Sequence, residues 1–182
     1  MARNQYGEPR ENDKTGILFV CHGNICRSTM AEFVMQELAR RAGLAEDFRI
    51  DSAATSREEL GNDVHPGTRA KLAAEGVPCG HHLARQMGPA DYDAFDHIVG
   101  MDQDNMDGIC RLLLGEKGYG FSWRPTSVRE RAAADPDHKV SRLLDWAGVD
   151  RDVADPWYTG NFDATYDDVL LGCTAMLDAL VR

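Results

Sequence analysis

A short apolar run, Ile17-Leu18-Phe19-Val20, is followed at once by the seven-residue segment from Cys21 to Arg27, and this pairing most constrains how the chain can fold. Four consecutive apolar residues are typical of a strand buried on both faces, as in a parallel sheet. Beyond the segment, apolar residues recur at helical spacing as far as Ala42, and Gly43 is a natural helix stop. The sequence therefore predicts a strand, a loop and a helix in direct succession.

The same alternation continues along the chain. Strand-like apolar runs and helical patterns take turns, with glycine and proline residues between them. Strands separated by helices of this length predict an α/β fold, doubly wound, with a four-stranded parallel sheet and helices on both faces. The predicted strands are 17–20, 48–52, 97–101 and 140–144, and the later predicted helices are 68–75, 104–114 and 166–181.

Length and composition fit one domain. The chain has 182 residues, of which 43% are hydrophobic, and a core of that size needs neither a metal nor disulfides to fold. Residues 1–15 lack apolar periodicity, so we expect a disordered N-terminal extension followed by a single domain over 16–182. Glycines and prolines between residues 115 and 137 predict a long loop that contains a helix at 128–134.

The charge balance argues against nucleic acid as a partner. Thirty acidic side chains against 20 basic ones give a net charge of −10, the opposite of a polyanion-binding surface. No apolar run approaches the ~18–20 residues of a membrane span, and the first residues are polar where a signal peptide would be apolar. We therefore expect no membrane partner and a cytoplasmic location, with the five cysteines as thiols.

The segment after the first strand has the composition of an anion-binding loop. It reads Cys21-His22-Gly23-Asn24-Ile25-Cys26-Arg27-Ser28 and lies between a strand and a helix, where open α/β sheets bind their ligands. Its backbone N–H groups can turn inward, and the helix N-terminus adds the positive end of its dipole. Gly23 and Asn24 most readily adopt the left-handed backbone that such a loop needs. The segment is predicted to bind phosphate or a similar oxyanion.

Cys21 and Arg27 give this loop its chemistry. Arg27 offers a planar pair of N–H donors to two phosphoryl oxygens and stays charged. The same positive groups favour the thiolate of Cys21 at neutral pH, which makes it a nucleophile. Ser28 can cap the helix and place a hydroxyl near the sulfur. A buried structural cysteine is the alternative for Cys21, and its setting favours the nucleophile.

The other cysteines outside the loop are predicted to be structural. Cys110 and Cys173 lie on apolar helical faces. Cys79 with His81 and His82 is a conceivable zinc site, but no second pair of ligands stands at the usual separation. We expect neither a metal nor a cofactor.

Together these residues resemble the low-molecular-weight protein tyrosine phosphatase family, whose loop reads Cys-x5-Arg-Ser directly after the first strand. An independent match is Asp155-Pro156-Trp157-Tyr158, which resembles the family's late Asp-Pro-aromatic-Tyr segment. The similarity runs over about 16–182 and implies a phosphotyrosine protein phosphatase I-like fold. Further segments that resemble the family, in the right order, are Met30-Ala31-Glu32, Asp51-Ser52-Ala53-Ala54, His82 to Gln86, and Met101-Asp102 with Asn105.

The resemblance implies a role for each matching residue. Cys21 is expected to form a phosphocysteine intermediate, Arg27 to hold the phosphate, and Asp155 to protonate the leaving phenolate and then to activate water. This makes the chain a protein tyrosine phosphatase that acts on phosphotyrosine in a protein or peptide. The hydrogen-bonded scaffold of the loop is expected from Asn24, Ser52 and His82, and the aromatic wall of the cleft from Trp157 and Tyr158.

Three features depart from the family pattern. Thr29 stands where the family usually has proline. Glu58 and Glu59 occupy a segment where relatives often place an aromatic wall, and two carboxylates there disfavour acidic phosphopeptides. The loop at 115–137 is longer than the family usually carries. These departures concern substrate preference rather than the reaction.

Two relatives with the same loop provide alternative functions. Protein arginine phosphatases carry threonine at the place of Ile25, a position that faces the substrate, so Ile25 favours phosphotyrosine. Arsenate reductases of this fold add a redox cysteine after the third strand, where this chain has Met101, although Cys79 or Cys110 is a conceivable substitute. A phosphate-binding protein without chemistry would be expected to lack Cys21 or Asp155, and both are present.

Cys26 leaves two interpretations open. The family resemblance implies that it can form a disulfide with an oxidised Cys21 and so protect it, whereas a small hydrophobic residue facing the core is the simpler interpretation. For the quaternary state we expect a monomer or a weak homodimer.

Overall fold

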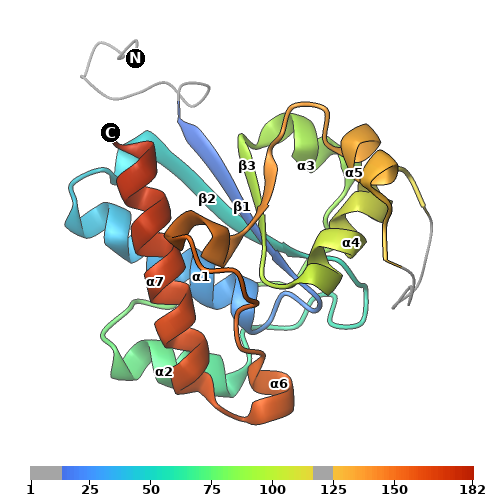
Figure 1. Cartoon of the computed structure of the whole chain (residues 1–182). Helices are drawn as coiled ribbons and strands as arrows, with labels where there is room; N and C mark the ends of the chain where they lie inside the picture. The colour runs from blue at the N-terminus through green and yellow to red at the C-terminus, as the bar shows by residue number, and fades with distance from the viewer. Residues whose placement is uncertain (1–13, 117–124) are drawn as a thin grey trace.

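The structure, a computed structural model, describes residues 14–116 and 125–182. In this part of the chain four parallel strands form one sheet, as predicted, and their order is β2-β1-β3-β4 (Figure 1). The strands are β1 (Thr15–Cys21), β2 (Phe48–Ala54), β3 (His97–Gly100) and β4 (Val140–Arg142). Because β2 and β3 lie on opposite sides of β1, the carboxyl end of β1 is the point where the strand order reverses.

The central strand β1 contributes side chains to both faces of the sheet. Ile17, Phe19 and Cys21 belong to one hydrophobic core, and Leu18 and Val20 belong to the other. All five are buried. The uninterrupted apolar run is therefore required, since alternate side chains of a strand point to opposite faces and here both faces are covered.

Helices cover the two faces as separate layers. Figure 1 shows α1 (Arg27–Arg41) and α7 (Phe162–Leu180) packed together on one face, with α2 (Pro66–Ala74) below them. The other face carries α3 (Pro89–Ala94), α4 (Gln103–Leu113) and α5 (Val128–Ala134). Three further short elements are η2 (Ala45–Asp47), η3 (Leu143–Ala147) and α6 (Pro156–Thr159). None of these described helices is long and apolar enough to cross a membrane.

Several element boundaries differ from the predictions. β4 ends at Arg142 rather than 144, because the Asp145 carboxylate accepts a hydrogen bond from the Arg142 N–H and starts the η3 turn. α7 begins four residues earlier than predicted, because the Asn161 side chain caps it by accepting from the Ala164 N–H at 3.0 Å. β1 begins at Thr15, inside the predicted extension, and residues 1–13 lie outside the described part.

The predicted loop at 115–137 contains α5 at the predicted residues. Ser127 and Glu130 form a capping box at its start, in which the Ser127 side chain accepts from the Glu130 N–H. Asp107 of α4 binds both the N–H and the hydroxyl of Thr126 and so attaches this segment to the main domain. Residues 117–124 lie outside the described part of the chain.

Close packing between α7 and η3 leads to a stability prediction. A Cβ added at Gly172 would lie 2.5 Å from Leu143 Cγ and 3.0 Å from its carbonyl oxygen. We expect Gly172→Ala to destabilise the protein by about 1–3 kcal/mol, although alanine is the better helix former by about 1 kcal/mol. Urea unfolding measures the change, with Thr174→Ala on the exposed side of the same helix as the control. A variant as stable as the wild type would contradict this packing.

Candidate active site

The loop between β1 and α1 is fixed from outside through its carbonyl groups. The carbonyls of Cys21, His22 and Ile25 accept hydrogen bonds from neighbouring backbone N–H groups at 2.8–3.0 Å. In contrast, the Asn24 N–H points to the Cys21 sulfur at 3.3 Å. With its carbonyls held outside, the loop is free to present N–H groups to an anion.

Asn24, and not Gly23, supplies the left-handed backbone conformation of the loop. Asn24 has φ of 59°, whereas Gly23 is absent from the described glycines with positive φ. The prediction that Gly23 also adopts a left-handed backbone conformation is therefore wrong. A Cβ at Gly23 would lie 3.1 Å from Glu59 Cγ, so the glycine is explained by the close approach of Glu59.

The Asn24 side chain connects the loop to β2. Its amide nitrogen donates to Ser28 Oγ at 3.0 Å and to Ser52 Oγ at 2.8 Å. Because Ser28 Oγ already accepts from Asn24, its own proton is available to the Cys21 sulfur, which lies 3.0 Å away. The predicted hydroxyl beside the sulfur is thus present.

Arg85 and His82 form two further hydrogen bonds with Asn24. Its side-chain oxygen accepts from the Arg85 N–H at 3.1 Å, and its carbonyl oxygen lies 2.7 Å from His82 Nε2. Since a carbonyl only accepts, His82 is the donor in this contact. Burial lowers the pKa of His82. The three residues predicted as the loop scaffold, Asn24, Ser52 and His82, therefore lie in one connected network.

The first turn of α1 differs from the prediction in its cap. Cys26 occupies the N-cap position and makes no capping bond with its side chain, and Ser28 lies inside the helix with its hydroxyl toward Cys21. The predicted cap at Ser28 is wrong, because the hydroxyl is used by the sulfur. Thr29 instead donates from its hydroxyl to the Cys26 carbonyl at 2.8 Å.

Cys26 is buried and keeps its proton. Burial, followed by the negative charge of Cys21, raises the pKa of its thiol to about 12. A buried, protonated thiol fits the simpler interpretation of Cys26 as a small hydrophobic residue. The disulfide with Cys21 stays a prediction. Cys110 and Cys173 are also buried free thiols, as predicted.

Arg27 is buried between two carboxylates. One nitrogen forms a short hydrogen bond to Asp102, and the other lies 2.6 Å from Asp155 Oδ2. Burial alone would lower the pKa of Arg27, but the charges of Cys21, Asp102 and Asp155 raise it. The guanidinium is therefore charged and aligned beside the sulfur before any anion arrives.

The two carboxylates come from separate elements near the same end of the sheet. Asp102 is the N-cap of α4 and binds the Asn105 N–H at 2.6 Å with one oxygen, which leaves the other for Arg27. Asp155 is the N-cap of α6 and accepts from the Trp157 N–H at 2.9 Å. Capping thus holds each carboxylate in place.

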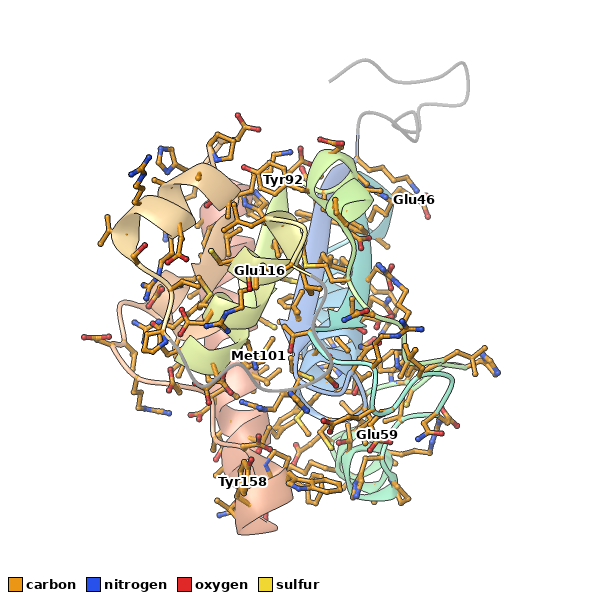
Figure 2. The ribbon with its side chains drawn as sticks, turned by 90° about the vertical axis from the view of Figure 1, so that its right-hand side faces the viewer. Glu46, Glu59, Tyr92, Met101, Glu116 and Tyr158 are labelled. Carbon is orange, nitrogen blue, oxygen red and sulfur yellow. The ribbon has the colours of Figure 1, made fainter. Side chains whose placement is uncertain are left out.

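A cleft of about 290 Å³ opens above the loop. Cys21, Arg27 and Asp155 line its floor, together with His22, Gly23, Ile25 and Cys26 of the loop. Trp157 and Tyr158 are exposed on one side, and Glu58 and Glu59 lie on another. Figure 2 shows Tyr158 and Glu59 on different segments near one end of the molecule. The sequence-predicted aromatic and acidic residues are thus brought together around one opening.

The structure also brings in two groups whose contacts were not predicted. Asp102 as the partner of Arg27, and Glu32 as the partner of Ser52 at 2.5 Å, both depend on residues distant in sequence. The sequence signal for Asp102 was an acidic residue just after the third strand. Because β3 lies next to β1, a residue at that position lies near the loop that follows β1. In the described ranges, no group of three His, Cys, Asp or Glu side chains is placed to hold a metal, and this includes Cys79, His81 and His82.

Fold and loop define a class of protein: a doubly wound α/β domain with a cysteine and an arginine in the loop at its switch point, where both line a cleft. Residues 16–119 match the family described as low molecular weight phosphotyrosine protein phosphatase. The chain belongs to this family.

Relatives match over nearly the whole chain. The low molecular weight protein-tyrosine-phosphatase YfkJ of Bacillus subtilis is 36% identical over 91% of this chain and 96% of its own length. PtpA of Staphylococcus aureus, with the same description, is 32% identical over 91% of this chain and 94% of its length. The crystal structure of YfkJ covers 94% of this chain and 98% of its own, with a TM-score of 0.78.

An arginine phosphatase shares the fold as well. The Drosophila arginine phosphatase DARP superposes with a TM-score of 0.73 at 26% identity, covering 91% of this chain and 98% of its own. The fold thus serves two phosphoryl substrates in different proteins, so side chains of the cleft must distinguish them.

The scaffold contains a titratable group with a testable effect on stability. Burial, and to a smaller extent the charge of Asp51, raises the pKa of Glu32 from 4.5 to about 7. Between these pH values the folded protein therefore binds more protons than the unfolded chain. The contribution of Glu32 to stability falls as the pH rises from about 4.5 to 7 and is constant at higher pH.

We expect Glu32→Gln to remove up to about 3 kcal/mol of this pH dependence. Urea unfolding of both proteins between pH 5 and 8 measures it, because other acidic groups titrate alike in both and cancel in the difference. If the stability of wild type and variant depended on pH in the same way, Glu32 would not have the raised pKa that its burial implies.

Proposed function

We propose that this chain hydrolyses phosphotyrosine in proteins or peptides through a phosphocysteine intermediate. The observation that carries the proposal is the position of the Cys21 sulfur at the floor of the cleft, with the Ser28 hydroxyl at 3.0 Å and the Asn24 N–H at 3.3 Å. Both contacts stabilise a thiolate. The names of the relatives support the same substrate class.

In the first step the thiolate of Cys21 attacks phosphorus, and the bond from phosphorus to the phenolic oxygen breaks. A phosphate dianion accepts hydrogen bonds from the guanidinium of Arg27, whose terminal nitrogens also contact Asp102 and Asp155. Asp155 lines the same cleft and, after taking up a proton from solvent, protonates the phenolate in its carboxylic acid form. The two planar donors of Arg27 match the charge that spreads over the phosphoryl oxygens.

In the second step water attacks the phosphocysteine. The carboxylate of Asp155 takes a proton from the water, the phosphorus–sulfur bond breaks, and the electron pair returns to Cys21. The hydroxyl of Ser28 stabilises this leaving thiolate, because its proton is already directed to the sulfur. Inorganic phosphate is released and the free enzyme is restored.

Side chains of the cleft favour phosphotyrosine over phosphoarginine and arsenate. Ile25 lines the cleft as an apolar residue, and exposed Trp157 and Tyr158 provide an aromatic side for a phenyl ring. Met101 is buried at the end of β3, where the resemblance places the redox cysteine of arsenate reductases. The proposal includes no cofactor, a cytoplasmic location, and a monomer or weak homodimer.

Cys21→Ser tests the nucleophile. We expect complete loss of phosphotyrosine hydrolysis, since a serine hydroxyl is neither ionised at neutral pH nor a good leaving group. Purified wild type and variant are compared on phosphotyrosine, phosphoarginine, phosphoserine and arsenate side by side. Wild-type turnover that is greatest on phosphoarginine or arsenate, or activity that survives in Cys21→Ser, would overturn the proposal.

Asp155→Asn tests the general acid. We expect a loss of about 10²–10⁴-fold on phosphotyrosine, but a much smaller loss on an aryl phosphate whose leaving group needs no proton. Single-turnover rates on the two substrates measure the difference. Equal losses would assign Asp155 a purely structural role at the start of α6.

A further inference from the structure

Arg111 is a buried cation that the reaction described above does not use. It lies in the last turns of α4, is 8% exposed, and lines the same cleft as Cys21 and Arg27. Within residues 14–116 and 125–182, its buried Nε and Nη2 atoms have no hydrogen-bond partner. The described ion pair is long, with 3.9 Å between Arg111 Nε and Glu116 Oε2. A guanidinium in this state is costly to bury unless something completes its hydrogen bonds.

The other groups near Arg111 do not complete them. Asp107, one turn away on α4, accepts from Thr126 and lies 3.5 Å from Arg131. Glu116 is half exposed and can turn to solvent. Arg27 offers the comparison within the same cleft, because both of its terminal nitrogens are held by carboxylates. Arg111 therefore lines the cleft with a guanidinium whose hydrogen bonds are incomplete.

The length of α4 sets the distance between Arg111 and the site of Arg27. Asp102, which contacts Arg27, caps the start of α4, and Arg111 follows nine residues later along the same cleft wall. Nine residues of helix rise about 13 Å. An extended peptide covers this distance in about four residues. Figure 2 shows Glu116, just beyond α4, well separated from Tyr158 and Glu59 at the catalytic end.

We propose that Arg111 is a specificity-determining residue that binds a side-chain carboxylate of the substrate, three to five residues from the phosphotyrosine. This deepens the proposed function and rests on it. Glu58 and Glu59 lie on a different segment of the cleft and repel acidic residues there. The cleft is acidic along α4 as well, where Asp104, Asp107 and Glu116 also line it, so an acidic residue is favoured only at the one position that reaches the Arg111 guanidinium.

Wild-type kinetics on matched peptides give the first test. Phosphotyrosine peptides carry glutamate or glutamine at each position from two to six residues on either side, and kcat/KM is measured for each pair. We expect a preference of about tenfold for glutamate at one position, three to five residues away and on one side only. A lack of preference at every position would overturn the inference, whereas failure to hydrolyse any of the peptides would overturn the proposed function itself.

Arg111→Met supplies the second test, because methionine keeps much of the buried side-chain stem and removes the charge. We expect the glutamate-to-glutamine ratio to fall from about ten to about one. Arg40→Met is the matched control: it removes an exposed charge at the far end of α1 and should keep the wild-type ratio. A ratio that persists in Arg111→Met would refute the assignment. Should that variant not fold by circular dichroism, Arg111→Gln replaces it, because glutamine also removes the charge, and an unchanged ratio there would refute the assignment equally.

Discussion

The left-handed backbone at Asn24 is the constraint on which the rest of the site depends. This conformation is unfavourable for a residue with a side chain, and here five hydrogen bonds compensate for it: those to Ser28, Ser52, Arg85, His82 and the Cys21 sulfur. These partners come from β1, α1, β2 and the segment before α3. The loop geometry is therefore a property of the whole sheet rather than of the loop sequence alone.

The free site is held by its own carboxylates. Asp102 and Asp155 each contact one terminal nitrogen of Arg27, so the buried guanidinium has a counter-charge on both nitrogens. An anion that enters the cleft therefore meets a cation already paired with two carboxylates. A phosphate dianion competes better there than a weakly charged or neutral ligand, because it offers more negative charge and two oxygens in one plane.

What the sequence predicts well is local. The strand, the loop and the start of α1 occupy consecutive residues, so Cys21, Arg27 and the Ser28 hydroxyl could be placed from spacing alone, and family resemblance added Asp155. The Arg27–Asp102 contact depends instead on β3 lying beside β1, and the orphaned donors of Arg111 depend on how α4 packs. The cap at Ser28 and the conformation of Gly23 were mispredicted because tertiary contacts with Cys21 and Glu59 outweigh local preference.

Gly108 of α4 packs tightly against the side chain of Thr55 across the cleft. A Cβ at Gly108 would lie 2.8 Å from Thr55 Cγ2 and 2.9 Å from its Cβ, and both residues line the cleft. A side chain at position 108 would therefore push α4 away from the segment after β2. This one glycine keeps the two sides of the cleft close together.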